Sequence, residues 1–262
     1  MAEAIDLTSP KAVALAALSC LDLTELGDTA TEAATLSLVD RAINEFGSVA
    51  AVCIWPRFVA AARAQLGAKS PVRIATVVNF PSGDLPVDEV VAETTRAVAD
   101  GADEIDLVIP WKALIAGDEQ AVRDMIRAVR AAAPAPTRLK TILETGELKD
   151  PALISRASDI ALEEQADFIK TSTGKVAVNA TLDAARIMLE VIQRSGKPVG
   201  FKPAGGIRTV EDAGAYFALC EEILGVGWVS PSTFRFGASG LLGDILATLE
   251  DRTPSAGQGE AY

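Results

Sequence analysis

Histidine is absent from this chain of 262 residues. The absence excludes a catalytic triad or an acid–base scheme built on imidazole, and it excludes every metal site with a histidine ligand. The chain has only three cysteines, Cys20, Cys53 and Cys220, and they form no CxxC pattern. An odd, unpaired set of cysteines suits a reducing compartment better than a disulfide scaffold, so we expect a cytoplasmic protein.

Basic segments and long hydrophobic runs are also missing. The formal net charge is −12 and no stretch interleaves basic with aromatic residues, so nucleic acid and anionic membranes are poor partners. No apolar run approaches the roughly 18 residues that a membrane-spanning helix needs. The first residues contain acids and lack the basic segment of a signal peptide, so none is expected. An anionic small molecule stays compatible with this charge if a local pocket is positive.

Hydrophobic residues, in contrast, make up 49% of the chain, which is enough for one large core. Short strand-like runs alternate with longer amphipathic segments. Several of the short runs are almost continuously apolar, as expected for parallel strands covered by helices. We expect eight strands, at residues 19–23, 49–54, 72–78, 104–109, 139–143, 167–170, 199–202 and 227–230, with an extension of the last at 235–236.

Helical periodicity lies between these strands. It is clearest at residues 86–99 and 182–193, and around Val122 and Ile154. No GxGxxG motif follows the first strand, which weakens the alternative of an open dinucleotide-binding sheet. The pattern predicts a single-domain (β/α)8 TIM barrel over residues 1–250, with an extra N-terminal helix. A mobile polar tail is expected at 251–262.

Two lysines, Lys170 and Lys202, each close an apolar strand and precede a turn of small residues. A buried ammonium is costly, so lysine seldom ends a hydrophobic strand without a partner or a function. A snorkelling or salt-bridged lysine explains one such position well, but two in one barrel less well. If the two amines converge, each cation disfavours protonation of the other. One of them then becomes a neutral nucleophile suited to Schiff-base chemistry.

Other charged residues are expected at the same end of the barrel, where the active sites of this fold lie. Four of the nine lysines belong to these strand-end segments, namely Lys140, Lys170, Lys175 and Lys202. Asp106 interrupts the apolar run EIDLVIP and needs a partner there. Two interpretations are compatible: an ion pair with a neighbouring lysine, and a general acid or base that reaches a substrate hydroxyl or water.

Glycine-rich turns follow the seventh strand and the strand-eight region. Barrel enzymes commonly bind phosphate at this place, with backbone N–H groups and a helix N-terminus. Each turn alone is a weak signal, but two at the expected places predict an anion site. The residues concerned are Thr173, Gly174, Lys175, Gly205, Gly206, Gly237 and Ser239.

Nine segments, which span nearly the whole chain, carry a further signal. They read LDLTELGD, VCIWPRF, VVNFP, GADEIDLVIP, ETGELKD, ADFIKTSTGKVAVNAT, GFKPAGGIRT, FRFGAS and the terminal tyrosine. In this order they resemble the 2-deoxyribose-5-phosphate aldolases, which are class I aldolases. The resemblance implies reversible cleavage of 2-deoxy-D-ribose 5-phosphate to acetaldehyde and D-glyceraldehyde 3-phosphate, with neither metal nor organic cofactor.

The same resemblance implies a role for individual residues. Lys170 takes the Schiff-base position, and Lys202 the position of a second lysine that lowers its pKa. Asp106 and Lys140 match a proton relay that acts with an ordered water. The other matches are Asp22 and Thr24 as a supporting polar pair, Cys53 and Phe80 in the pocket wall, Gly174, Lys175, Gly205, Gly206, Gly237 and Ser239 in the phosphate cradle, and Tyr262 as the residue that protonates the enamine carbon.

One position departs from the family, because Gly240 stands where a second serine is common. Three other functions stay open: a metal-dependent aldolase or isomerase, which the lack of histidine opposes; a Schiff-base barrel enzyme with another donor, such as a transaldolase-like enzyme; and a non-catalytic sugar-phosphate binding protein. Alanine-rich helix faces suit a homodimer, although they suit packing on the barrel equally well.

Overall fold

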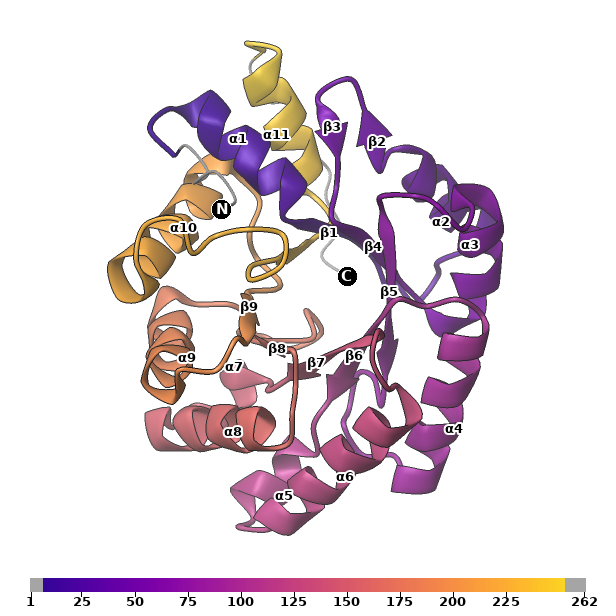
Figure 1. The fold of residues 1–262 in the computed structure, drawn as a ribbon, viewed down its shortest axis with the longest axis vertical. Coiled ribbons are helices and arrows are strands. Elements are labelled where there is room, and N and C mark those ends of the chain that lie inside the picture. Colours follow the sequence, from indigo (N-terminus) through magenta and orange to yellow (C-terminus); the bar gives the residue numbers. More distant parts are fainter. Residues whose placement is uncertain (1–6, 253–262) are drawn as a thin grey trace.

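The structure, a computed structural model, describes residues 7–252 as a barrel of parallel strands surrounded by helices (Figure 1). Eight strands form one sheet in the order β10-β1-β4-β5-β6-β7-β8-β9, and every adjacent pair is parallel. Their bounds are β1 Leu21–Glu25, β4 Ala51–Ile54, β5 Arg73–Val78, β6 Glu104–Val108, β7 Arg138–Ile142, β8 Phe168–Lys170, β9 Gly200–Lys202 and β10 Phe236–Ala238. The predicted TIM barrel is confirmed.

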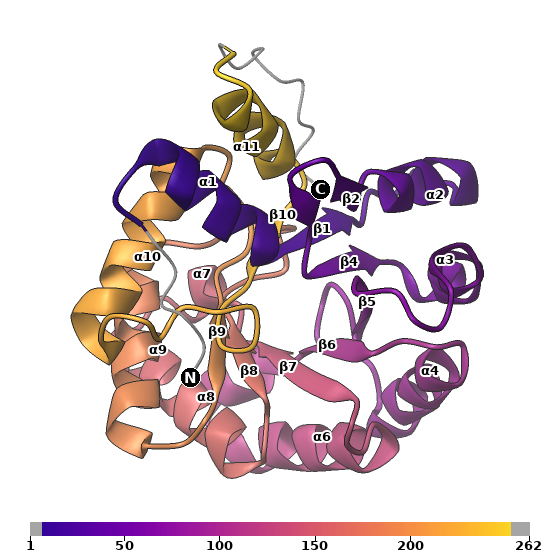
Figure 2. The ribbon, with the colours of Figure 1, turned by 45° about the horizontal axis from the view of Figure 1, so that its top comes forward.

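Helices cover the outside of this sheet on all sides (Figure 2). They are α1 Pro10–Ser19, α2 Glu32–Asp40, α3 Val59–Leu66, α4 Val87–Ala99, α5 Trp111–Ile115, α6 Glu119–Ala132, α7 Thr145–Leu148, α8 Pro151–Glu163, α9 Leu182–Ser195, α10 Val210–Leu224 and α11 Leu241–Leu249, with a 3-10 turn at Pro56–Phe58. The predicted extra N-terminal helix is α1, which packs against α10 and α11. Within residues 7–252, no helix is long and apolar enough to cross a membrane.

Local sequence signals define the ends of the helices. Thr181 and Thr209 lie just before α9 and α10, and each side chain accepts a hydrogen bond from a backbone N–H of the first helical turn. Asp212 completes a capping box with Thr209. Gly196 ends α9 in the left-handed conformation that glycine adopts without a steric penalty. These caps fix where each connecting loop leaves the barrel.

The eighth strand was predicted at the wrong place. Residues 227–230 form no strand but an irregular segment between a turn and a bend, and the strand is β10, which begins six residues after it. The predicted extension at 235–236 touches only its start. β10 is selected by its neighbours, because Leu21 of β1 pairs with Phe236 on one side. Tertiary pairing therefore overrides the local apolar pattern of the preceding segment.

Closure of the barrel runs through backbone contacts between β9 and β10. Phe201 donates its N–H to Thr233 and accepts one from Arg235, and Gly237 donates to Pro203. A Cβ on Gly237 would lie 2.7 Å from the Cβ of Ala204 and 3.1 Å from Lys202 Cε. Only glycine permits this close approach, so Gly237 is needed where β10 meets the end of β9.

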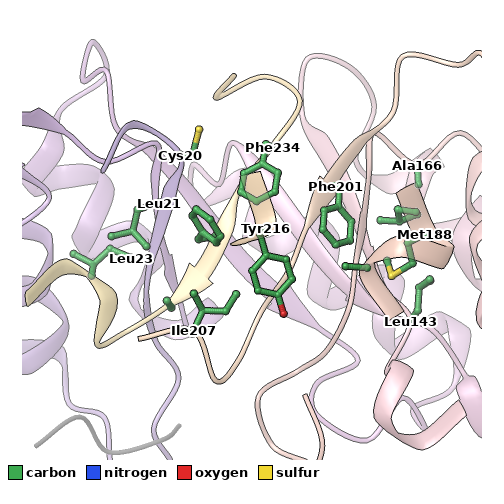
Figure 3. Packing of buried hydrophobic residues seen from close by; sticks show 14 of the residues in the cluster. Cys20, Leu21, Leu23, Leu143, Ala166, Met188, Phe201, Ile207, Tyr216 and Phe234 are labelled. Carbon is green, nitrogen blue, oxygen red and sulfur yellow. The ribbon is translucent and has the colours of Figure 1, made fainter. Parts of the chain in front are cut away.

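The main hydrophobic core lies between the strands and the helices. Figure 3 shows part of it, with Phe201, Phe234 and Tyr216 among the buried residues. The Phe201 and Phe234 rings meet edge to face at 6.0 Å, and Tyr216 meets Phe236 at 6.3 Å. These aromatic contacts pack α10 against β9 and β10, and β9 carries Lys202 of the candidate site.

The interior of the barrel differs from that core. Its apolar part is small and consists of Leu26, Ala51, Cys53, Ala75 and Val77. The rest of the barrel interior carries buried charged side chains, whereas branched aliphatic residues usually dominate it in this fold. Buried ions are costly unless they are paired, so charged side chains inside the barrel must be paired with one another and suggest a functional site.

Candidate active site

Lys170 and Lys202 are neighbours at the carboxyl end of the barrel. They are the last residues of β8 and β9 and lie opposite one another in the strand register. Both are buried, with 3% and 0% of their surface exposed. The two side chains therefore start from adjacent strands and enter the same interior, as the strand-end argument expects.

Asp106 joins the lysines. Its Oδ2 accepts hydrogen bonds from Lys170 Nζ and Lys202 Nζ, each at 2.8 Å. Its Oδ1 accepts one from Lys140 Nζ at 2.7 Å. The nitrogens of Lys170 and Lys202 are thus separated by no more than twice 2.8 Å, well inside the distance over which salt screens charges.

A second layer of charge lies deeper in the barrel. Asp22 accepts from Lys202 Nζ at 2.5 Å and from Arg235 Nη1 at 2.6 Å. Glu104 accepts two bonds from Arg235, at 2.9 and 3.1 Å, and contacts Lys140 Nζ at 2.6 Å. These contacts form a continuous network from Arg235, through Asp22 and Glu104, to the lysines. All of its side chains are buried.

The buried network has an excess of positive charge when every member is ionised. It joins three carboxylates, Asp22, Glu104 and Asp106, to four cations, Lys140, Lys170, Lys202 and Arg235. Loss of one proton would balance it. Among residues 7–252, Lys170 contacts a single carboxylate, whereas each of the other cations contacts two or more, so Lys170 is the member whose proton is most easily lost.

The shifts in pKa agree with this assignment, because the pKa of Lys170 is lowered and that of Lys202 is raised. Burial lowers the pKa of Lys170, and the Lys202 ammonium adds to the effect while Asp106 opposes it. Burial also acts against protonation of Lys202, but Asp106 and Asp22 outweigh it and raise its pKa well above the usual value. For Asp106, the three lysines overcome burial and hold the pKa well below its usual range. Burial, more than repulsion between the lysines, thus favours the neutral amine at Lys170.

The predicted supporting and wall residues lie beside this network. Thr24 is buried and donates its hydroxyl proton to the backbone oxygen of Asp22 at 2.7 Å, which fixes the hydroxyl on its own strand. Cys53 Sγ is 4.0 Å from Asp106 Oδ2. Phe80 packs edge to face on Trp55, with ring centres 5.5 Å apart, and covers the small apolar part of the barrel interior.

The predicted phosphate cradle brings together two loops from the carboxyl end. Gly205 donates its N–H to Gly237, which joins the loop after β9 to β10. Gly205 and Gly206 both have positive φ, +82° and +85°, and a Cβ on Gly206 would meet open space. Ser239 leads into α11, whose N-cap Gly240 makes no side-chain capping bond. The first N–H groups of α11 thus have no side chain at the cap competing for them.

The third part of the cradle is the turn after β8. Gly174 has a φ of +88°, and the Lys175 N–H donates to Thr173 Oγ1 at 3.0 Å. Thr173 in turn donates to Glu144 through its hydroxyl at 2.6 Å and its N–H at 3.2 Å. Lys175 Nζ pairs with Asp28 at 2.8 Å at the rim rather than with an inner residue.

Three residues of this site were not singled out from the sequence. Glu104 lies two positions before Asp106, which puts both on the inner face of β6, and that spacing was the available signal. Arg235 was treated only as part of a strand. Glu144, which accepts the hydroxyl hydrogen bond of Thr173, has no role in the sequence prediction. Tyr262 lies outside the described residues.

Comparison with known proteins agrees with the barrel fold and identifies the family. Residues 16–230 match the DeoC/LacD family aldolase. The chain belongs to this family. A deoxyribose-phosphate aldolase of Agrobacterium fabrum (strain C58 / ATCC 33970) is 62% identical over 251 residues, which are 96% of this chain and 97% of the relative. The family predicted from the sequence segments is therefore confirmed.

Solved structures of similar proteins support the same assignment. A putative deoxyribose-phosphate aldolase of Coccidioides immitis superposes with a TM-score of 0.79 at 30% identity, covering 90% of this chain and 86% of that chain. One of Toxoplasma gondii ME49 superposes with a TM-score of 0.84 at 26% identity, covering 95% and 98%. The DeoC/LacD family aldolase fold thus extends along almost the whole chain.

Proposed function

We propose that this DeoC/LacD family aldolase cleaves 2-deoxy-D-ribose 5-phosphate reversibly to acetaldehyde and D-glyceraldehyde 3-phosphate, with a Schiff base at Lys170. The observation that carries the proposal is the buried Lys170 held by a single carboxylate, next to a Lys202 that has two. The identity to the Agrobacterium fabrum enzyme supports the substrate. The glycine cradle beside the lysines suits its phosphate.

Lys170 begins the reaction as a neutral amine. Its lone pair adds to the aldehyde carbon C1 of the open-chain sugar, and loss of water from the carbinolamine leaves a protonated imine. A base then removes the proton of the C3 hydroxyl. The C2–C3 bond breaks, its electron pair moves into the imine, and glyceraldehyde 3-phosphate leaves with a new carbonyl at C3. Protonation of the enamine at C2 and hydrolysis release acetaldehyde and the free lysine.

Asp106 and Lys140 are assigned to the proton transfers, through an ordered water. Three lysines hold the pKa of Asp106 well below its usual range, so a proton that Asp106 accepts would be passed on rather than kept. Lys202, which is also bonded to Asp22, donates to the Asp106 carboxylate, and this carboxylate in turn accepts from Lys170 Nζ. Tyr262 is assigned to protonation of the enamine carbon, on the resemblance alone.

The wider expectations of the sequence belong to the same proposal. We expect sugar-phosphate and aldehyde substrates, no cofactor or metal, a cytoplasmic enzyme, and a homodimer as one assembly to be tested. Residues 251–262 are expected to be the segment that delivers Tyr262. Activity that persists after exhaustive dialysis against EDTA would exclude the metal-dependent alternative.

Borohydride trapping tests the central assignment. Acetaldehyde is incubated with the enzyme, borohydride reduces any imine to a stable secondary amine, and peptide mapping locates the adduct. We expect the adduct on Lys170 alone, none in Lys170→Ala, and an unchanged yield in Lys69→Ala, which replaces an exposed lysine that is not part of the candidate site. An adduct elsewhere, or trapping of dihydroxyacetone in preference to acetaldehyde, would reject this donor and nucleophile.

A further inference from the structure

The opposite end of the barrel contains a second cavity, of about 340 Å³. Its lining residues lie at, or just before, the first residues of the strands, whereas Lys170 and Lys202 lie at the last residues of theirs. The cavity is therefore separate from the candidate active site and opens at the amino ends of the strands. A volume of this size is near the lower limit for small-molecule sites.

Three arginines line this cavity, Arg73, Arg138 and Arg235. Arg73 and Arg138 begin β5 and β7, and Arg235 directly precedes β10. The concentration is unusual in a chain whose net charge is −12. Three guanidinium groups from three separate strands thus converge on one small space, together with the serines Ser19, Ser48 and Ser232.

The nearest carboxylate, Glu104, does not account for all three arginines. It already receives two hydrogen bonds from Arg235 and contacts Lys140 at 2.6 Å. Arg73 Nε and Arg138 Nη1 stay 3.7 and 3.8 Å from Glu104 Oε1, beyond hydrogen-bond distance. Arg73 and Arg138 therefore form only long ion pairs with Glu104, without a hydrogen bond to it.

Arg138 carries the clearest sign of a missing partner. Its Nη1 atom is buried and has no hydrogen-bond partner within the described part of the chain. A buried donor without an acceptor is uncommon in native proteins, because it loses its hydration without compensation. Burial lowers the pKa of Arg138, and repulsion from Arg235 and Arg73 adds to this effect while Glu104 opposes it.

We infer that this cavity is a second binding site, for a small dianion of the phosphate monoester class. Guanidinium groups recognise phosphate by paired N–H donors, and Arg73 with Arg138 can present such donors from two sides. Ser48 can add a neutral hydroxyl donor, whereas Ser19 already donates to the backbone oxygen of Ala16 and Ser232 is paired with Ser230. Arg235 lines the cavity and also binds Asp22, which accepts a hydrogen bond from Lys202. A bound ligand would therefore contact the buried charge network that includes Lys202.

Equilibrium dialysis with radiolabelled inorganic phosphate tests this site at constant ionic strength set with chloride. We expect Arg73→Gln/Arg138→Gln to bind one phosphate per chain fewer than wild type, whatever the active site contributes. Arg41→Gln/Arg96→Gln removes two exposed arginines instead and should bind as wild type, which separates the cavity from net charge. Equal stoichiometry in wild type and in the cavity variant would overturn the inference.

A second variant keeps the test decisive if the glutamine pair folds poorly. Arg73→Lys/Arg138→Lys preserves charge but removes the forked donors, and we expect its affinity at this site to fall at least tenfold. Circular dichroism and the thermal midpoint report folding of each variant. Unchanged affinity in the lysine pair would show that only diffuse charge is present and would also overturn the inference. Failure of the trapping experiment at Lys170 leaves this result unaffected.

Discussion

Replacement of Arg235 tests whether the charge network inside the barrel is a single coupled unit. Arg235 is 1% exposed and makes three hydrogen bonds to carboxylates, one to Asp22 and two to Glu104. Arg235→Met removes all three and leaves both acids short of a cation. Breaking a buried ion pair from one side costs about 3–5 kcal/mol. For a chain of this size, that loss lowers the thermal midpoint by about 6–10 °C.

A double-mutant cycle separates coupling from simple loss of packing. Glu104→Met should also destabilise, because Arg235 and Lys140 then lose a shared acceptor. When both partners become apolar, most of the desolvation cost disappears as well. The double variant Arg235→Met/Glu104→Met should therefore be clearly less destabilised than the sum of the two single variants, by about 2 kcal/mol or more.

Chemical denaturation followed by tryptophan fluorescence measures the four proteins of the cycle. The matched control is the exposed pair Arg186 and Glu222, with N–O distances of 2.8 and 3.0 Å, whose replacement by methionine should leave the midpoint unchanged. Additive losses at Arg235 and Glu104, within about 0.5 kcal/mol, would refute the reasoning. The interior would then be a set of independent pairs rather than one network.

Three further outcomes concern the reaction. Lys202→Leu should move the acid limb of the kcat/KM profile to higher pH, because loss of the neighbouring cation raises the pKa of Lys170 and delays its neutral form; an unmoved limb would contradict this. Asp106→Asn should lower kcat by about 10²–10⁴ in steady-state assays, the usual loss of a proton-transfer group. Gly240→Ser should lower KM for the phosphorylated substrate about 2–10-fold by adding one hydroxyl donor, and an equal or higher KM would reject a role for this position.

The strands in the first half of the chain could be predicted because their own apolar pattern is enough to locate them. β4 is a continuous apolar run, β5 is apolar after its first residue except for Thr76, and β6 is interrupted only by its two acids; all three pair with their neighbours in chain order. β10 could not be located in this way. It has three residues, and pairing with β1 across more than two hundred positions determines where it begins. The preceding segment 227–230 is about as apolar as β10, so the local pattern predicts the strand at the wrong place.

The same distinction applies to the site. Lys170 and Lys202 stand out because lysine at the end of an apolar strand needs an explanation, and Asp106 because it interrupts one. Glu104 and Arg235 sit at the beginnings of strands, where a charge ordinarily indicates solvent. Only their contact, between residues 131 positions apart, shows that they are buried partners. The spacing from Asp106 predicts which face of the strand carries Glu104, but no pattern within one segment identifies Arg235 as its partner.

The glycine that closes the barrel has a consequence for how the enzyme could be altered. Gly237 lies against both Ala204 and the methylene chain of Lys202, so any added side chain would push the amine away from its acids. Efforts to widen substrate choice by random mutation should therefore recover almost no variants here, even conservative ones. Diversity is better sought at Phe80 and Trp55, where bulk can change without disturbing where the ammonium sits.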